Sequence, residues 1–104
     1  MSDRELLELA AKAAGYEYAK HGGYIVVDGI PGNWNPLTDD GDALRLAVKL
    51  GLMIDIQNKV NATSVWTTDE SGSADFDAAH GKDPYAATRR AIVRAAAEIG
   101  KAIP

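Results

Sequence analysis

The sequence predicts a single α+β domain over residues 1–104, in which three helices pack with a mainly antiparallel sheet of four to five strands. The chain has 104 residues, of which 46% are hydrophobic, which is enough for one compact core and too few residues for two domains. Three segments carry apolar residues at helical spacing between start and stop signals. The segments between them are short and are joined by turn residues, which favours hairpins and therefore antiparallel pairing.

The N-terminal third predicts a helix followed by a hairpin. Ser2 and Glu5 have the spacing of a capping box, apolar residues follow at helical spacing, and Gly15 is expected to end the helix. The stretch YEYAKHGGYIVVD, residues 16–28, alternates around a Gly22–Gly23 turn and is typical of a β-hairpin.

A second helix is expected after Pro36, which restricts Asn35 to an extended conformation. Either Thr38 or Asp39 is predicted to cap it, and the next acidic residues lie in the first turn, where the helix dipole favours anions. Gly51 is expected to end it. We expect its core-facing side to consist of Leu44, Ala47 and Val48, widened by Leu46 and Leu50.

The remaining segments predict three strands and a last helix, giving the order α-β-β-α-β-β-(β)-α. LMIDIQ, residues 52–57, alternates so that Leu52, Ile54 and Ile56 face the core. TSVWTTD, residues 63–69, is the next strand, and ADFDA, residues 74–78, is a short edge strand.

In the last helix Asp83 is the predicted cap and Pro84 the first residue. Its alanine-rich face predicts that it lies flat on the sheet through Ala91, Ile92 and Ala95.

Composition narrows the function classes. Eleven basic and fifteen acidic residues leave a formal charge of −4, whereas nucleic-acid binding requires clustered lysine and arginine, so no nucleic-acid partner is expected. The absence of cysteine excludes disulfides and thiolate metal sites. There is no apolar run of the ~20 residues that a membrane span needs, and the charged start does not predict a signal peptide. We therefore expect a soluble, cytoplasmic protein.

Two stretches of the chain resemble a family of small phage and prophage proteins described as the phage α-β-α sandwich domain. One is WNPLTDDGDALRLAVKLGL, residues 34–52, and the other is DPYAATRRAIVRAAAEIGKA, residues 83–102, with a polar hairpin between them. The resemblance covers most of the chain from Leu6 onward. It implies an α-β-α sandwich and a phage or prophage origin, which would place the protein in the cytoplasm of the bacterial host. The family has no established activity, so the resemblance implies no catalytic residue.

No catalytic or metal-binding motif is present, so we expect a protein that is not an enzyme and that holds no metal or cofactor. The three aspartates of the second helix do not fit an EF-hand loop, because with Gly41 as the sixth residue the twelfth would be Ala47. His21 and His80 lack metal-ligand spacing and are expected to be surface residues of turns. Ser64, Ser71 and Ser73 lack the G-x-S-x-G elbow of a nucleophilic serine.

The candidate binding surface combines the loop before the second helix with arginines of the last helix. It consists of Trp34, Asn35, Asp39, Asp40, Asp42, Arg89 and Arg90. Trp34 either packs on the core, which the tendency of large aromatic residues to be buried favours, or contacts a partner.

Two functions follow from these residues. The first is an uncharacterised phage or prophage accessory protein that acts by non-catalytic binding to another protein. The alternative is a small-ligand or nucleotide-binding module that uses the 33–42 loop and the arginine-bearing last helix. The sequence leaves the oligomeric state and the partner open.

Overall fold

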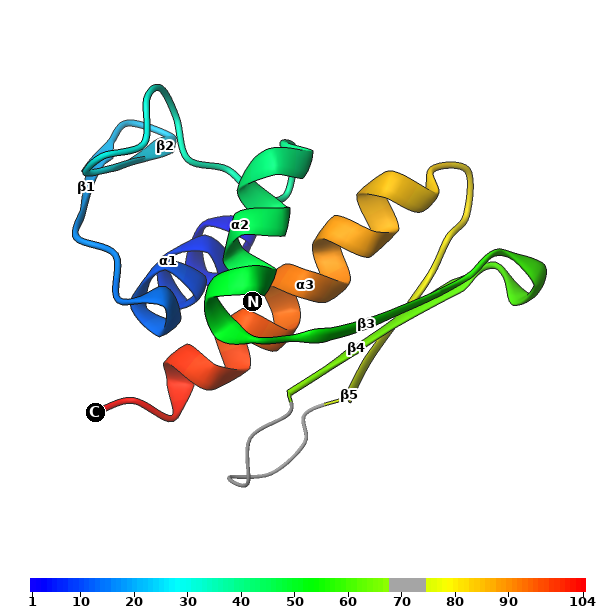
Figure 1. Ribbon diagram of the computed structural model, residues 1–104. Helices are drawn as coiled ribbons and strands as arrows, with labels where there is room; N and C mark the ends of the chain where they lie inside the picture. Colours follow the sequence, from blue (N-terminus) through cyan, green and yellow to red (C-terminus); the bar gives the residue numbers. More distant parts are fainter. Residues whose placement is uncertain (68–74) are drawn as a thin grey trace.

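The computed structural model describes residues 1–67 and 75–104 and confirms the α+β class (Figure 1). The helices are α1 (Asp3–Ala14), α2 (Asp40–Leu50) and α3 (Pro84–Lys101). The strands are β1 (Tyr18–His21), β2 (Tyr24–Val27), β3 (Met53–Gln57), β4 (Ala62–Trp66) and β5 (Asp75–Ala79), and a 3₁₀ turn, η1 (Asn58–Val60), joins β3 to β4. The order of elements is the predicted one. The end of the predicted fourth strand, residues 68 and 69, lies outside the described residues.

The strands form two separate antiparallel sheets, so the prediction of one four- to five-stranded sheet was wrong. One sheet is the β1–β2 hairpin and the other has the strand order β3-β4-β5. The free edge of β2 is partly occupied by a loop: the backbone N–H of Trp34 donates to the carbonyl oxygen of Ile25 at 2.8 Å, in an isolated β-bridge. Within the described residues, this single bridge is the hairpin's only further β-pairing.

The helices lie between the two sheets (Figure 1). Helix α1 packs against β2 on one side and α3 on the other, and α3 packs in turn on β4 and β5. The layers therefore run sheet, helices, sheet, whereas the family resemblance implied a sheet between two helical layers.

The helix ends agree with the sequence signals. The Glu5 backbone N–H donates to Ser2 Oγ, Asp39 rather than Thr38 caps α2, and Asp83 caps α3 by accepting from two backbone N–H groups. Gly15 and Gly51 end α1 and α2 at positive φ, 71° and 64°, which glycine adopts without the steric cost that a Cβ brings. These are short-range interactions, and each helix begins within one residue of the predicted position.

The buried side of α2 agrees only in part with the prediction: Leu46 and Ala47 are buried as expected, but two other predicted core residues are not. Leu44 is 60% exposed and Val48 is 72% exposed, although both were expected in the core. The buried apolar residues are Ala43, Leu46 and Ala47, because α2 packs against α3 and α1 rather than over a strand. Both sides of this helix carry apolar residues, and tertiary packing decides which one is covered.

Strand β3 is also less covered than predicted. Ile54 is half-buried, but Ile56, expected to face the core, is 55% exposed. Its cross-strand partner Thr63 is fully buried. The difference arises because α3 packs chiefly on β4 and β5, so the face that they share with β3 is left open at β3.

The alanine-rich side of α3 packs closely on α1 as well as on the sheet. A Cβ built on Gly100 would lie 2.0 Å from the carbonyl oxygen of Leu9. The two helices run parallel: the Arg90 guanidinium pairs with Asp3 at 3.1 Å near their starts, and Lys12 Nζ donates to the Ile103 carbonyl near their ends. The prediction of a close approach to the sheet was thus incomplete, because the closest approach is to α1.

Candidate functional site

Trp34 is a core residue. Its side chain is 0% exposed, and its ring meets that of Tyr16 edge-on, with centroids 5.6 Å apart. The indole Nε1 is buried without a hydrogen-bond partner in the described residues. The packing interpretation of Trp34 is therefore confirmed, and its ring is not available to a partner.

The loop that follows Trp34 is held by a network of its own. The Asn35 backbone N–H donates to Asp42 Oδ2 at 3.0 Å, and Asn35 Oδ1 accepts from the Leu37 backbone N–H. Asp39 Oδ2 accepts from the Asp42 backbone N–H at 2.8 Å, as a helix cap. Asp42 is only 4% exposed, and its Oδ1 accepts from Arg45 at 2.7 Å, a hydrogen bond that raises the pKa of Arg45. These carboxylates and the amide are engaged in shaping the loop.

Arg89 of α3 ties this loop to the last helix. Its Nε donates to the Leu37 carbonyl oxygen at 2.8 Å, and its Nη1 lies 2.6 Å from Asp40 Oδ1. The Arg89 side chain is 16% exposed, whereas that of Asp40 is 68% exposed. Arg90 points elsewhere, to Asp3 of α1. Of the predicted surface, the structure thus brings Asp40 and Arg89 together and joins Asn35, Asp39 and Asp42 in the loop network, whereas Trp34 is buried and Arg90 pairs with α1.

The acidic residues do not assemble a metal site. In the part of the chain that the structure describes, no group of three or more histidine, aspartate or glutamate side chains is arranged to hold a metal ion. The aspartates of the α2 start act as a cap, a loop clamp and an ion-pair partner, as described above.

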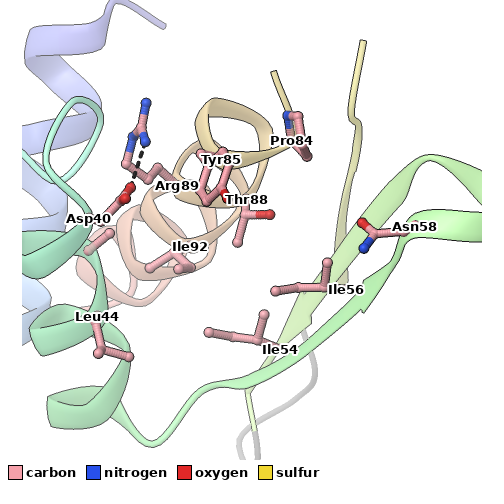
Figure 2. A pocket seen from close by; sticks show the side chains of 11 residues that line it. Asp40, Leu44, Ile54, Ile56, Asn58, Pro84, Tyr85, Thr88, Arg89 and Ile92 are labelled. Carbon is pink, nitrogen blue, oxygen red and sulfur yellow. Dashed lines mark hydrogen bonds and ion pairs between the residues drawn. The ribbon is translucent and has the colours of Figure 1, made fainter. Parts of the chain in front are cut away.

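An apolar groove with a volume of about 360 Å³ lies between α2, α3 and β3 (Figure 2). In the close-up, Leu44 points into it from α2, Ile54 and Ile56 from β3, and Ile92 from α3. The full lining is Asp40, Ala43, Leu44, Ile54, Ile56, Asn58, Pro84, Tyr85, Thr88, Arg89 and Ile92. We call this surface the α2–α3–β3 groove.

The groove is open, and three of its large apolar side chains are exposed. Leu44 is 60% exposed, Ile56 55% and Tyr85 68%. The sequence analysis missed the groove because it assigned Leu44 and Ile56 to the core. One signal was available: Asp40, Leu44 and Val48 follow at intervals of four, so they form a second side of α2 distinct from Ala43 and Ala47.

Three polar side chains of the groove, those of Asp40, Arg89 and Thr88, have partners within the protein. At one end Asp40 pairs with Arg89 (Figure 2). On α3 the hydroxyl of Thr88 lies 2.9 Å from that of buried Thr63, which lies 2.7 Å from His80 Nε2. His80 is 6% exposed, so its assignment to the surface was wrong. It does lie in a turn, since its carbonyl accepts from the Asp83 N–H, but its ring is buried against Thr63.

The groove combines exposed apolar side chains with an ion pair at one end. The groove presents exposed aliphatic side chains and one exposed tyrosine, and its charged groups already pair with each other.

None of the described helices is long and apolar enough to cross a membrane. Searches with this chain match no family model, no curated protein and no solved structure.

Proposed function

We propose that this protein acts by non-catalytic binding of another protein, and that the α2–α3–β3 groove is its contact surface. The observation that carries the proposal is the exposure of Leu44, Ile56 and Tyr85 around one concavity. Leaving large apolar side chains in water is unfavourable, and contiguous patches of them on a folded protein mark interaction sites. An aromatic side chain at such a surface is typical of residues that dominate binding energy. That the partner belongs to a phage or prophage context rests on the sequence resemblance alone.

The arrangement of charge favours a protein over a small anionic ligand. A nucleotide site would need a cation that is free to meet phosphate oxygens, and the Arg89 guanidinium is engaged by the Leu37 carbonyl and by Asp40. The groove volume of about 360 Å³ is at the lower end of ligand pockets, and its rim side chains are exposed rather than enclosing. An apolar segment of a protein fits these features better.

The test compares two matched variants, Leu44→Glu in the groove and Val60→Glu outside it. The two parent residues are 60% and 64% exposed, so each change should alter the free energy of unfolding by less than about 0.5 kcal/mol. Immobilised wild-type protein and both variants are incubated with bacterial lysate, and captured proteins are quantified by mass spectrometry. Each candidate partner is then purified and titrated.

We expect a partner that binds the wild type and the Val60 variant equally and binds the Leu44 variant at least about tenfold more weakly, a loss of ~1.4 kcal/mol. Partners that bind all three proteins alike would refute the groove as the contact surface.

A further inference from the structure

Strand β3 is an open edge of the three-stranded sheet. It pairs with β4 on one side, from Met53↔Trp66 to Gln57↔Ala62, and within the described residues no strand pairs with its other side. Such an edge presents a row of unpaired backbone N–H and C=O groups that can pair with an added strand.

The helical layer extends beyond this edge. Helix α3 packs on β4 and β5, while α2 packs beside α3 and α1, and the α2–α3–β3 groove separates it from β3. Leu44 and Val48 of α2 are therefore exposed, with no described strand packed against them. A strand added to β3 would lie about 4.8 Å further along the sheet, at the side where the groove is open. A single added strand could therefore both pair with the open edge of β3 and cover the exposed apolar residues of α2.

The groove face of β3 has the period of a strand. Ile54 and Ile56 lie opposite Val65 and Thr63, and both isoleucines line the groove. Side chains of an added strand alternate between the two faces in the same way, so every second residue of the occupant would extend this apolar surface toward Leu44. An occupant with apolar residues at alternate positions is required.

The opposite face of the sheet carries acidic side chains beside the stretch of β3 that contains Ile54 and Ile56. Asp55 of β3 lies opposite Ser64 of β4, which lies opposite Asp77 of β5. Asp77 accepts a hydrogen bond from Ser64 at 2.5 Å, and Asp55 accepts one from Gln57 at 2.5 Å. Both donors are neutral, and within the described residues neither carboxylate forms an ion pair. Opposite charges on neighbouring strands are favourable and like charges are unfavourable. The outward residues of an added strand should therefore be basic.

The same charge argues against a second copy of this chain as the occupant. A symmetric antiparallel pairing of two β3 strands centred on Asp55 would place the two Asp55 side chains directly opposite each other. We infer that the partner contributes an extended segment with alternating apolar and basic residues, which adds to the edge of β3 and inserts its apolar side chains into the α2–α3–β3 groove. This inference rests on the proposed function and names the class of partner.

The probe is a ten-residue synthetic peptide in which valine and lysine alternate, compared with one in which glutamate replaces every lysine. A third peptide has the valine–lysine composition in two blocks and controls for attraction to the net charge of −4. Each peptide is titrated into ¹⁵N-labelled protein, and amide shifts and hydrogen exchange are followed by NMR. We expect the alternating lysine peptide to shift and protect amides of Met53–Gln57 and to bind more tightly than the blocked peptide.

Charge exchange provides the decisive variant. In Asp55→Lys the lysine peptide should bind about threefold to tenfold more weakly and the glutamate peptide more tightly by a similar factor. Asp55→Asn should be intermediate and serves if the lysine variant does not fold. Asp28→Lys changes the same charge at an exposed residue outside the sheet and should leave the preference almost unchanged.

Three results would overturn the inference. The first is that the Asp28 and Asp55 variants change peptide affinity equally. The second is that the peptide shifts amides of α2 and α3 without protecting those of β3 from exchange, and the third is that protection of β3 rises with protein concentration alone, which would identify a second copy as the occupant. The proposed function would survive the second result, because the groove would still bind a partner, and it fails separately if Leu44→Glu leaves the natural partner bound.

Discussion

Gly100 occupies the closest contact between the first and last helices, and Gly100→Ala tests that contact. A Cβ at this position would lie 2.0 Å from the Leu9 carbonyl oxygen and 2.8 Å from the carbonyl carbon. The distance to the oxygen is roughly 1.3 Å shorter than the ~3.3 Å at which a carbon atom ordinarily meets a carbonyl oxygen. The obstacle is backbone, so a rotamer change cannot relieve it, and α1 and α3 must move apart.

Two effects of opposite sign set the magnitude. Alanine is favoured over glycine in a helix interior by up to about 1 kcal/mol, and by less at Gly100, which is one residue from the end of α3. Overpacking of a close contact costs about 1–3 kcal/mol or more. Because the clash is with backbone, we expect the cost to dominate and the free energy of unfolding to fall by roughly 1–3 kcal/mol. For a domain of this size the Tm should fall by about 5–15 °C.

The measurement is urea unfolding followed by tryptophan fluorescence, together with a thermal melt. Gly23→Ala is the matched control, because a Cβ at Gly23 meets no heavy atom within 4 Å and its φ is not in the left-handed region. If Gly100→Ala unfolds at the same urea concentration as Gly23→Ala, the close α1–α3 contact is not as described.

Two further predictions concern the core and an ion pair. Trp34→Ala should lower the free energy of unfolding by about 3–5 kcal/mol, because it removes a side chain that is 0% exposed. Val60→Ala, at a position that is 64% exposed, should change the free energy of unfolding little and serves as the control. Equal urea midpoints for the two variants would contradict the packing of Trp34. At Glu8 desolvation raises the pKa, but hydrogen bonds from Lys20 and Arg4 outweigh this effect, so the pKa is lowered. The ionised Glu8 therefore stabilises the fold at pH values above its unfolded-state pKa of about 4.3. This stabilisation is lost as the pH falls through the lower pKa of the folded state. Glu8→Gln should therefore be less stable than the wild type at pH 7, by at most about 1 kcal/mol, and the gap should close in urea titrations below about pH 4; a gap that does not change with pH would rule out the ion pair.

Local signals predicted the element order and the helix ends well. Caps such as Ser2, Asp39 and Asp83 act within three residues, so their partners are present in the same short stretch of sequence. The division into two sheets could not be predicted in this way. It depends on which strands meet in the fold: within the described residues β1 pairs with β2 and β3-β4-β5 pair among themselves, and the Trp34 backbone bridges to β2 at Ile25.

The candidate site was predicted only in part, for a related reason. Periodicity shows which residues share a side of an element, not whether another element covers that side. Leu44 and Ile56 were assigned to the core on periodicity and are exposed, because the sheet ends at β3. Asp40 and Arg89 were both in the predicted surface and do meet, but mainly to fasten a loop. The groove arises from tertiary arrangement alone.

The parallel pairing of α1 and α3 also has a consequence for synthesis on the ribosome. The contacts from Asp3 to Arg90 and from Lys12 to Ile103 span 87 and 91 residues of sequence. The apolar side of α1, with Leu6, Leu7 and Ala10 buried in the finished fold, therefore has no α3 to pack on until the residues that separate the two helices and α3 itself have been translated. Contacts of such separation slow folding, and a nascent amphipathic helix that waits for its partner is a site where chaperones can bind.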